Sequence, residues 1–384
     1  MTDLFVIFSM NENGVFAQPA HVNSALRDAM SSPPFSFEDV FIYSHGWWTV
    51  ADDAMDLYSR YVVEFSKNLS LIEEQLVRRP QQSFGFGIHW PSTVSEDMNS
   101  FLQEAEQAAS YFIMGARAEQ VGSTGLYAAL SLMIQRRLAS PNPVPLRLTL
   151  LGHSFGCRVV CSALQRMATE LGKTTAQPNV RDFVQNLQIR AVLLEPAFKN
   201  VELDVGGNYS SLATSFPNLK VLITTSQLDY ALNHYFPLSE ELNNIANLLK
   251  PVAVALGAGM PNPPPAPNVT PMPPVLTQSG VVAQAPGGGP TLTTWQAFGG
   301  QGLVTPLRIT PGFKPTDFSL PQPQRIAVAD LTAVHMANLM PTQSSDDLAA
   351  AEGPEWMWNK FSGSHSDILC PEIFNLIAGF VFNA

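Results

Sequence analysis

The chain has 384 residues, 31 of them proline, and a formal net charge of −11 at pH 7. An acidic chain without a basic patch argues against nucleic acid and against anionic membrane surfaces as partners. Hydrophobic residues make up 46% of the sequence, which is enough for a large core and excludes global disorder.

No apolar run approaches the roughly 18 residues that a membrane helix needs. The first residues carry no basic stretch, and the apolar run Leu4–Met10 has no cleavage-site pattern, so no secretory signal is recognisable. Three cysteines do not make a disulfide framework. We therefore expect no integral membrane segment and, by default, a cytoplasmic protein, with export by another route left open. The oligomeric state is not determined by the sequence.

Strand-like and helix-like segments alternate along the chain. Short apolar, β-favouring runs occur at 39–44, 84–90, 146–151, 189–194, 219–225 and 325–330. Most gaps between them are long enough for a crossover helix, and helical spacing of apolar residues follows Ser154 and, again, Pro371. This pattern predicts an α/β fold with a mostly parallel central sheet flanked by helices.

One region interrupts the alternation. Residues 251–290 contain 11 prolines and 6 glycines, a composition that cannot form a helix or a central strand. We expect residues 1–384 to form a single domain that carries a Pro/Gly-rich insertion at 240–320. The insertion is interpreted as an ordered cap or lid over a site, with a disordered insertion as the alternative.

The strongest motif is Gly152-His153-Ser154-Phe155-Gly156, between the 146–151 strand and the helix that follows. A serine in a strand–turn–helix junction with glycines two positions before and after it is typical of a nucleophile elbow. The turn is so tight that these flanking positions must be nearly free of side chains. We predict that Ser154 is a catalytic nucleophile and that the backbone N–H of Phe155 helps to stabilise an oxyanion.

A second motif, Ser44-His45-Gly46-Trp47-Trp48, follows the 39–44 strand. The loop after this strand supplies the other oxyanion donor in many such enzymes, and we assign that role to the backbone N–H of Trp47. His45 is expected to be a hydrogen-bonded structural residue of the loop. Trp48 and Trp90 are candidates for an apolar substrate pocket, with core filling as the equal alternative.

The base is assigned to His365, in a polar loop just before the C-terminal helix, in preference to His335, which lies in a helix-like segment. The acid that orients the base is assigned to Asp229, just beyond the 219–225 strand, in preference to Glu195 after the preceding strand. No metal-ligand motif or P-loop is present, and we expect no cofactor.

The chain order Ser154, Asp229, His365 belongs to one group of serine hydrolases. With Leu150-Leu-Gly-His-Ser-Phe-Gly156, Tyr43-Ser-His-Gly-Trp47 and Gly363-Ser-His-Ser-Asp367, the sequence resembles the α/β-hydrolase superfamily, on the lipase/esterase side and similar to bacterial serine hydrolases. The resemblance implies an α/β-hydrolase fold and acyl transfer to water through an acyl-enzyme. It does not imply a particular substrate, and the 136-residue separation of Asp229 and His365 is longer than usual.

Few charged residues lie in the candidate pocket segments, which favours an uncharged, fairly apolar carboxylic ester as a small-molecule substrate. Two alternatives remain at this point. The chain could be an amidase or peptidase that uses the same triad. It could also be a non-catalytic interaction protein with this fold, in which the proline-rich insertion binds a partner.

Overall fold

The structure is a computed structural model of the whole chain. It describes residues 2–30, 37–47, 49, 51–78, 83–92, 113–140, 145–173, 177–198, 202–203, 206–226, 229, 281–283, 291–292, 296–297, 302–321, 323–339 and 368–383.

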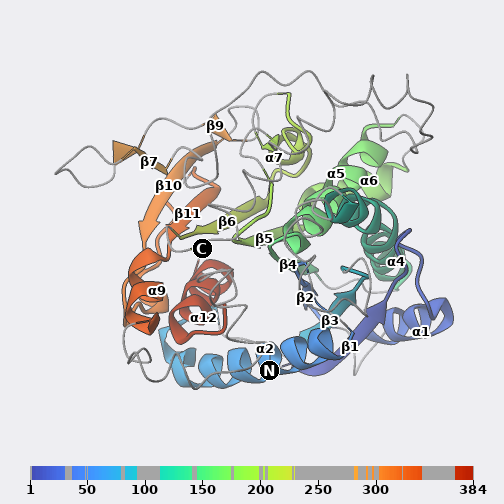
Figure 1. Cartoon of the computed structure of the whole chain (residues 1–384). Coiled ribbons are helices and arrows are strands. Elements are labelled where there is room, and N and C mark those ends of the chain that lie inside the picture. Colours follow the sequence, from blue (N-terminus) through green and yellow to red (C-terminus); the bar gives the residue numbers. More distant parts are fainter. Residues whose placement is uncertain are drawn as a thin grey trace, which may run out of the picture.

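A single large sheet organises the molecule (Figure 1). Its strand order is β1-β3-β2-β4-β5-β6-β11-β10-β9, and every neighbouring pair from β1 to β10 is parallel, while β9 joins β10 antiparallel. The strands are β1 (Thr2–Ser9), β2 (Asp39–Ser44), β3 (Ser83–His89), β4 (Arg147–His153), β5 (Gln188–Leu194), β6 (Leu219–Thr225), β9 (Gln296–Ala297), β10 (Gly302–Arg308) and β11 (Ile326–Asp330). A separate two-stranded sheet pairs β7 (Val281–Ala283) with β8 (Thr291–Leu292).

Helices cover both faces of the large sheet (Figure 1). One face packs against α1 (Pro19–Met30), α4 (Tyr127–Leu138), α5 (Gly156–Gly172), α6 (Pro178–Asn186) and α7 (Leu212–Ser215). The other packs against α2 (Ala51–Ile72), α9 (Thr332–Leu339) and α12 (Pro371–Ala378). The short helices are η1 (Glu73–Gln75), η2 (Gly122–Leu126), η6 (Pro315–Asp317) and η8 (Gly379–Asn383), and residues 113–121 are also helical.

Successive side chains along the strands point alternately into two hydrophobic cores, one on each face of the sheet. In β2, Val40 and Ile42 join the core under α1, α4 and α5, while Phe41 and Tyr43 face the core under α2 and α12. Because both faces are buried, the parallel strands are nearly continuous apolar runs, and this explains why they were visible in the sequence. The predicted α/β fold with a mostly parallel sheet flanked by helices is confirmed.

All six predicted strands are present, as β2, β3, β4, β5, β6 and β11, and the helices expected after Ser154 and from Pro371 are α5 and α12. Strand β10 falls inside the predicted 240–320 insertion. It pairs with β11 in the large sheet, and Phe313 and Phe318 belong to the core beside α12, so we place residues 302–320 with the sheet. Apart from β7, residues 251–290 lie outside the described residues.

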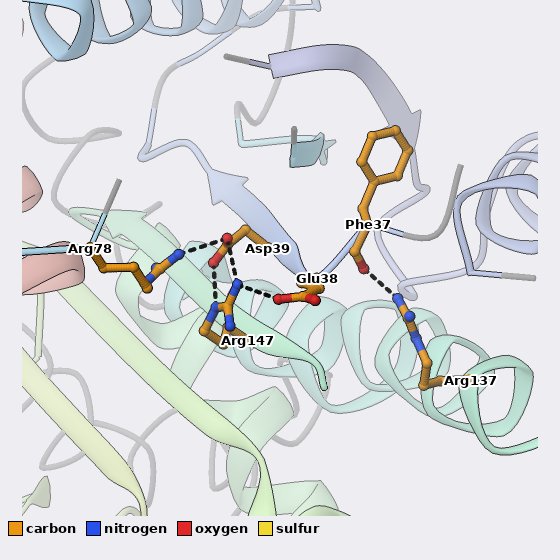
Figure 2. A network of polar contacts seen from close by, with 6 residues as sticks. All are labelled: Phe37, Glu38, Asp39, Arg78, Arg137 and Arg147. Atoms are coloured by element: carbon orange, nitrogen blue, oxygen red, sulfur yellow. Dashed lines mark hydrogen bonds and ion pairs between the residues drawn. The ribbon is translucent and has the colours of Figure 1, made fainter. Parts of the chain in front are cut away.

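A polar network ties together the amino ends of β2 and β4 (Figure 2). Asp39, the register partner of Arg147, accepts hydrogen bonds from Arg147 Nε at 2.9 Å and Nη2 at 2.9 Å, and from Arg78 Nη1 at 2.8 Å. Burial alone would raise the pKa of Asp39, but the two guanidinium groups outweigh it and hold that pKa below its ordinary value. Arg147 also binds Glu38, and Arg137 donates to the carbonyl of Phe37.

Among the helices that the structure describes, none is both long enough and apolar enough to cross a lipid bilayer.

Candidate active site at the carboxyl ends of the strands

Ser154 occupies a strained turn between β4 and α5. Its φ is +53°, a left-handed conformation that a non-glycine residue rarely adopts and that costs on the order of 1–3 kcal/mol. The backbone is held on both sides, because Ser154 N–H donates to the Leu194 carbonyl at 2.9 Å and the Ser154 carbonyl accepts from Ala197 N–H at 3.2 Å. The whole residue is 5% exposed. Such imposed strain is common at functional sites.

The two glycines of the motif are sterically required. A Cβ on Gly152 would stand 2.6 Å from the backbone of Gly156 and Cys157. A Cβ on Gly156 would stand 2.1 Å from the Ser44 carbonyl oxygen, at the end of β2. The Gly152–Gly156 motif therefore folds as the tight strand–turn–helix junction that the sequence predicted, pressed against the end of the neighbouring strand.

The loop after β2 lies against this junction. A Cβ on Gly46 would stand 2.8 Å from Ser154 Cβ, and the rings of Trp47 and Phe155 meet edge to face with centroids 6.1 Å apart. The chain changes direction at β2, whose neighbours are β3 and β4, so the loops after β2 and β4 flank the switch point of the sheet. Open α/β sheets bind ligands at such points.

His45 is a buried structural residue of this loop, as expected from the sequence. Trp90 N–H donates to its Nε2 at 3.2 Å, so Nδ1 carries the proton and donates to the Gly46 carbonyl at 2.7 Å. Burial, together with nearby His89, lowers the pKa of His45 to about 3 and outweighs the hydrogen bond to the Gly46 carbonyl, which raises it. The ring is therefore neutral at physiological pH, and its tautomer is set by its two backbone partners.

Tyr58 of α2 supports the same loop from the other face of the sheet. Its hydroxyl accepts from His45 N–H at 3.0 Å and donates to the Ile88 carbonyl at 2.5 Å, so it joins the ends of β2 and β3. The ring can approach because β3 has a glycine beneath it: a Cβ on Gly87 would stand 2.4 Å from Tyr58 Cδ2. We did not predict a role for Tyr58, since only the glycine spacing in Phe84-Gly-Phe-Gly87 hints at a ring lying on the strand.

These contacts orient the two peptide groups assigned as oxyanion donors. The Gly46 carbonyl, in the same peptide as Trp47 N–H, is held by the His45 ring. The Ser154 carbonyl, in the same peptide as Phe155 N–H, is held by Ala197 N–H at 3.2 Å and Cys157 N–H at 3.1 Å. In a trans peptide the N–H points away from the C=O, so anchoring each carbonyl fixes the direction of its N–H.

The candidate acids lie along the same edge of the sheet. Asp229 follows β6 and is buried, and its N–H donates to the Ser226 carbonyl at 3.3 Å. Glu195 follows β5 directly, with φ +45°. His335 Nδ1, on α9 after β11, lies 3.8 Å from Glu195 Oε1, and both side chains are 0% exposed. The structure thus brings together the two residues that ranked second as acid and base.

The remaining candidates divide between the core and the part of the chain that is not described. Trp90 is 0% exposed and its ring stacks on His45 with centroids 5.3 Å apart, the contacts of a core aromatic. Trp48 and His365 lie outside the described residues. Cys157 and Cys161 are free and buried.

A small cavity of about 30 Å³ lies between α2 and the sheet, lined by apolar side chains and by Tyr43, Tyr58 and Tyr61. Its volume suits one or two water molecules. It is too small for an ester substrate.

In comparisons with known proteins, no family model, no curated protein and no solved structure gave a significant match to this chain.

Proposed function

We propose that this chain is a serine hydrolase that cleaves uncharged, fairly apolar carboxylic esters through an acyl-enzyme, and that Ser154 is its nucleophile. The observation that carries the proposal is the conformation of Ser154: φ +53° at the carboxyl end of β4, between two glycines that have no room for a side chain. This conformation costs free energy for a non-glycine residue, and such strained residues cluster at functional sites. Ser154 lies at the edge of the parallel sheet where ligands bind.

In the proposed reaction the Ser154 hydroxyl attacks the ester carbonyl while its proton passes to a histidine. The developing oxyanion is stabilised by the N–H groups of Trp47 and Phe155. The C–O bond to the alcohol then breaks, and the alcohol leaves with the proton from the histidine. Water repeats the sequence on the acyl-enzyme, releasing the carboxylic acid and free Ser154.

For the base and its orienting acid we propose His365 and Asp229, as the sequence predicted. Asp229 follows β6, two strands from the nucleophile strand β4. The buried contact of Glu195 with His335 supports one alternative, in which this pair serves Ser154 instead.

The first experiment is labelling with a fluorophosphonate, with the modified residue located by mass spectrometry. We expect the label on Ser154, and we expect hydrolysis of short and medium p-nitrophenyl esters to be abolished in Ser154→Ala. Ser162→Ala is the matched control, because Ser162 lies two turns further along α5, with its hydroxyl 3.1 Å from that of Tyr209. Equal ester hydrolysis by wild type and Ser154→Ala would rule the proposal out.

The second experiment separates the two acid–base pairs. If His365 and Asp229 serve Ser154, His365→Asn and Asp229→Asn should each lower kcat by about 10³–10⁴. His335→Asn and Glu195→Gln should then lower it far less at equal folded fraction. The reverse pattern would transfer both roles to His335 and Glu195 and leave the nucleophile unchanged.

A further inference from the structure

We propose that Arg158 is a positioning residue. Through Ala197, in the loop after β5, it fixes the direction of the Phe155 N–H that is assigned as an oxyanion donor. The inference rests on the proposed function, since it concerns a donor of that site. Arg158 forms a charged cluster with Glu202 and Glu119 that no sequence motif predicts. Its proposed effect on the reaction is indirect.

Arg158 lies on the first turn of α5, four residues beyond Ser154, and its side chain is 10% exposed. Its Nε donates to the Ala197 carbonyl at 2.9 Å. Ala197 N–H in turn donates to the Ser154 carbonyl at 3.2 Å. Ala197 is therefore held from both sides, by the guanidinium at its carbonyl and by the nucleophile residue at its amide.

The guanidinium is itself held by two carboxylates. Glu202 accepts in a fork, from Nη1 at 3.2 Å and Nη2 at 3.0 Å, and its side chain is 14% exposed. Glu119, in the helical residues 113–121, accepts from Nη1 at 2.7 Å. A planar guanidinium that binds a carboxylate bidentately has little freedom to turn, so its Nε–H has one direction.

Phe198 and Glu202 make further contacts around the Arg158 guanidinium. The Phe198 ring lies under the Arg158 guanidinium at 5.9 Å, and Tyr209 N–H donates to the Glu202 carbonyl at 2.7 Å. The rings of Phe198 and Tyr209 also meet edge to face, with centroids 5.5 Å apart. The charged cluster is thus packed against Phe198 and Tyr209 as well as hydrogen-bonded to Ala197.

The consequence for the site follows from peptide geometry. The Ser154 carbonyl and Phe155 N–H belong to one planar group, so a change in the Ala197–Ser154 hydrogen bond rotates the donor. Stabilisation of an oxyanion depends steeply on donor direction, and loss of one donor costs about 10²–10³ in kcat. We call the Arg158–Glu202 ion pair the clamp. Weakening this clamp should therefore slow the chemical step more than it weakens substrate binding.

The test uses Arg158→Lys and Glu202→Gln in the full chain. Arg147→Lys and Glu38→Gln are matched controls, because Arg147 binds Glu38 Oε2 at 2.8 Å and Asp39 at the opposite end of β4. The readouts are the rate of fluorophosphonate labelling at Ser154, kcat and KM for a p-nitrophenyl ester, inhibition by a phenylboronic acid, and the thermal midpoint.

We expect both clamp variants to be labelled about tenfold or more slowly, with a lower kcat, a little-changed KM and weaker boronate inhibition. The controls should lose thermal stability to a similar degree while keeping wild-type labelling. Clamp variants that label like the controls would overturn the role of Arg158 and leave the serine hydrolase standing. Wild-type protein that is not labelled at Ser154 would overturn both.

Discussion

Gly46 lies so close to Ser154 that it has no room for a side chain: a Cβ built on Gly46 would stand 2.8 Å from Ser154 Cβ and 3.2 Å from the His153 carbonyl oxygen. The two residues follow different strands, β2 and β4, and are more than one hundred residues apart in the chain. Their proximity places the Trp47 peptide beside Ser154, the proposed nucleophile.

Gly46→Ala should separate these segments. Real Cβ atoms do not approach other atoms within 3.0 Å, so the loop must move away from Ser154. We expect about 1–3 kcal/mol lower stability and at least about tenfold slower ester hydrolysis per folded molecule. Gly172→Ala is the control, since nothing lies within 4 Å of its Cβ. A Gly46→Ala enzyme at the wild-type rate would contradict the role of this loop.

Tyr58→Phe should destabilise the protein, because it removes the hydroxyl that joins His45 N–H to the Ile88 carbonyl. These two buried backbone groups then lose their hydrogen bonds to Tyr58. The expected cost is about 1–3 kcal/mol in urea unfolding, with slower fluorophosphonate labelling.

Tyr61→Phe is the matched control for Tyr58→Phe. Both tyrosines are buried on α2, but the Tyr61 hydroxyl has no hydrogen-bond partner within the part of the chain that the structure describes. We expect Tyr61→Phe to be neutral or slightly stabilising. Equal losses in the two variants would argue against the Tyr58 bridge.

His45 should make stability depend on pH. Burial, reinforced by nearby His89, sets its folded-state pKa at about 3, below an unfolded value of about 6.5, so only the unfolded chain takes up this proton between those values. Stability is therefore fully present above about pH 6.5 and decreases on acidification, by about 1.4 kcal/mol per pH unit for one proton. In His45→Gln, urea unfolding between about pH 4 and 6 should show a slope shallower by one proton. An unchanged slope would contradict the prediction that His45 stays neutral in the folded protein over this pH range.

Asp39→Asn tests the polar network at the amino ends of β2 and β4, opposite the candidate site. Losing the carboxylate leaves Arg147 and Arg78 without their shared partner, and we expect about 2–4 kcal/mol lower stability near neutral pH. Because the folded-state pKa of Asp39 lies below its ordinary value, the wild-type advantage is present above that ordinary value and disappears as pH falls through the folded pKa. Asp28→Asn removes an exposed pair with Arg27 and should leave the unfolding midpoint unchanged. Similar midpoints for the two variants at neutral pH would contradict the role of the network.

The sequence was sufficient for the features that depend on local pattern. Strands buried on both faces are continuous apolar runs, so β2, β4 and β6 were found nearly residue for residue. The Gly152–Gly156 spacing indicated a tight turn because the steric demand is local. Strand β10 was not found, since Pro306 interrupts its pattern; the strand tolerates this proline because, among the residues that the structure describes, only 302 and 303 of β10 pair with β9.

The sequence by itself determined the parallel sheet, the turn at Ser154 and the two segments that supply the proposed oxyanion donors, because hydrophobic periodicity and glycine spacing act over a few residues. Only the tertiary structure decided what holds those groups in place. The contacts of Tyr58 with His45, Ala197 with Ser154, and His335 with Glu195 join strands and helices that are distant in the chain. No local pattern encodes them, since they arise when the sheet order brings the carboxyl ends of its strands together.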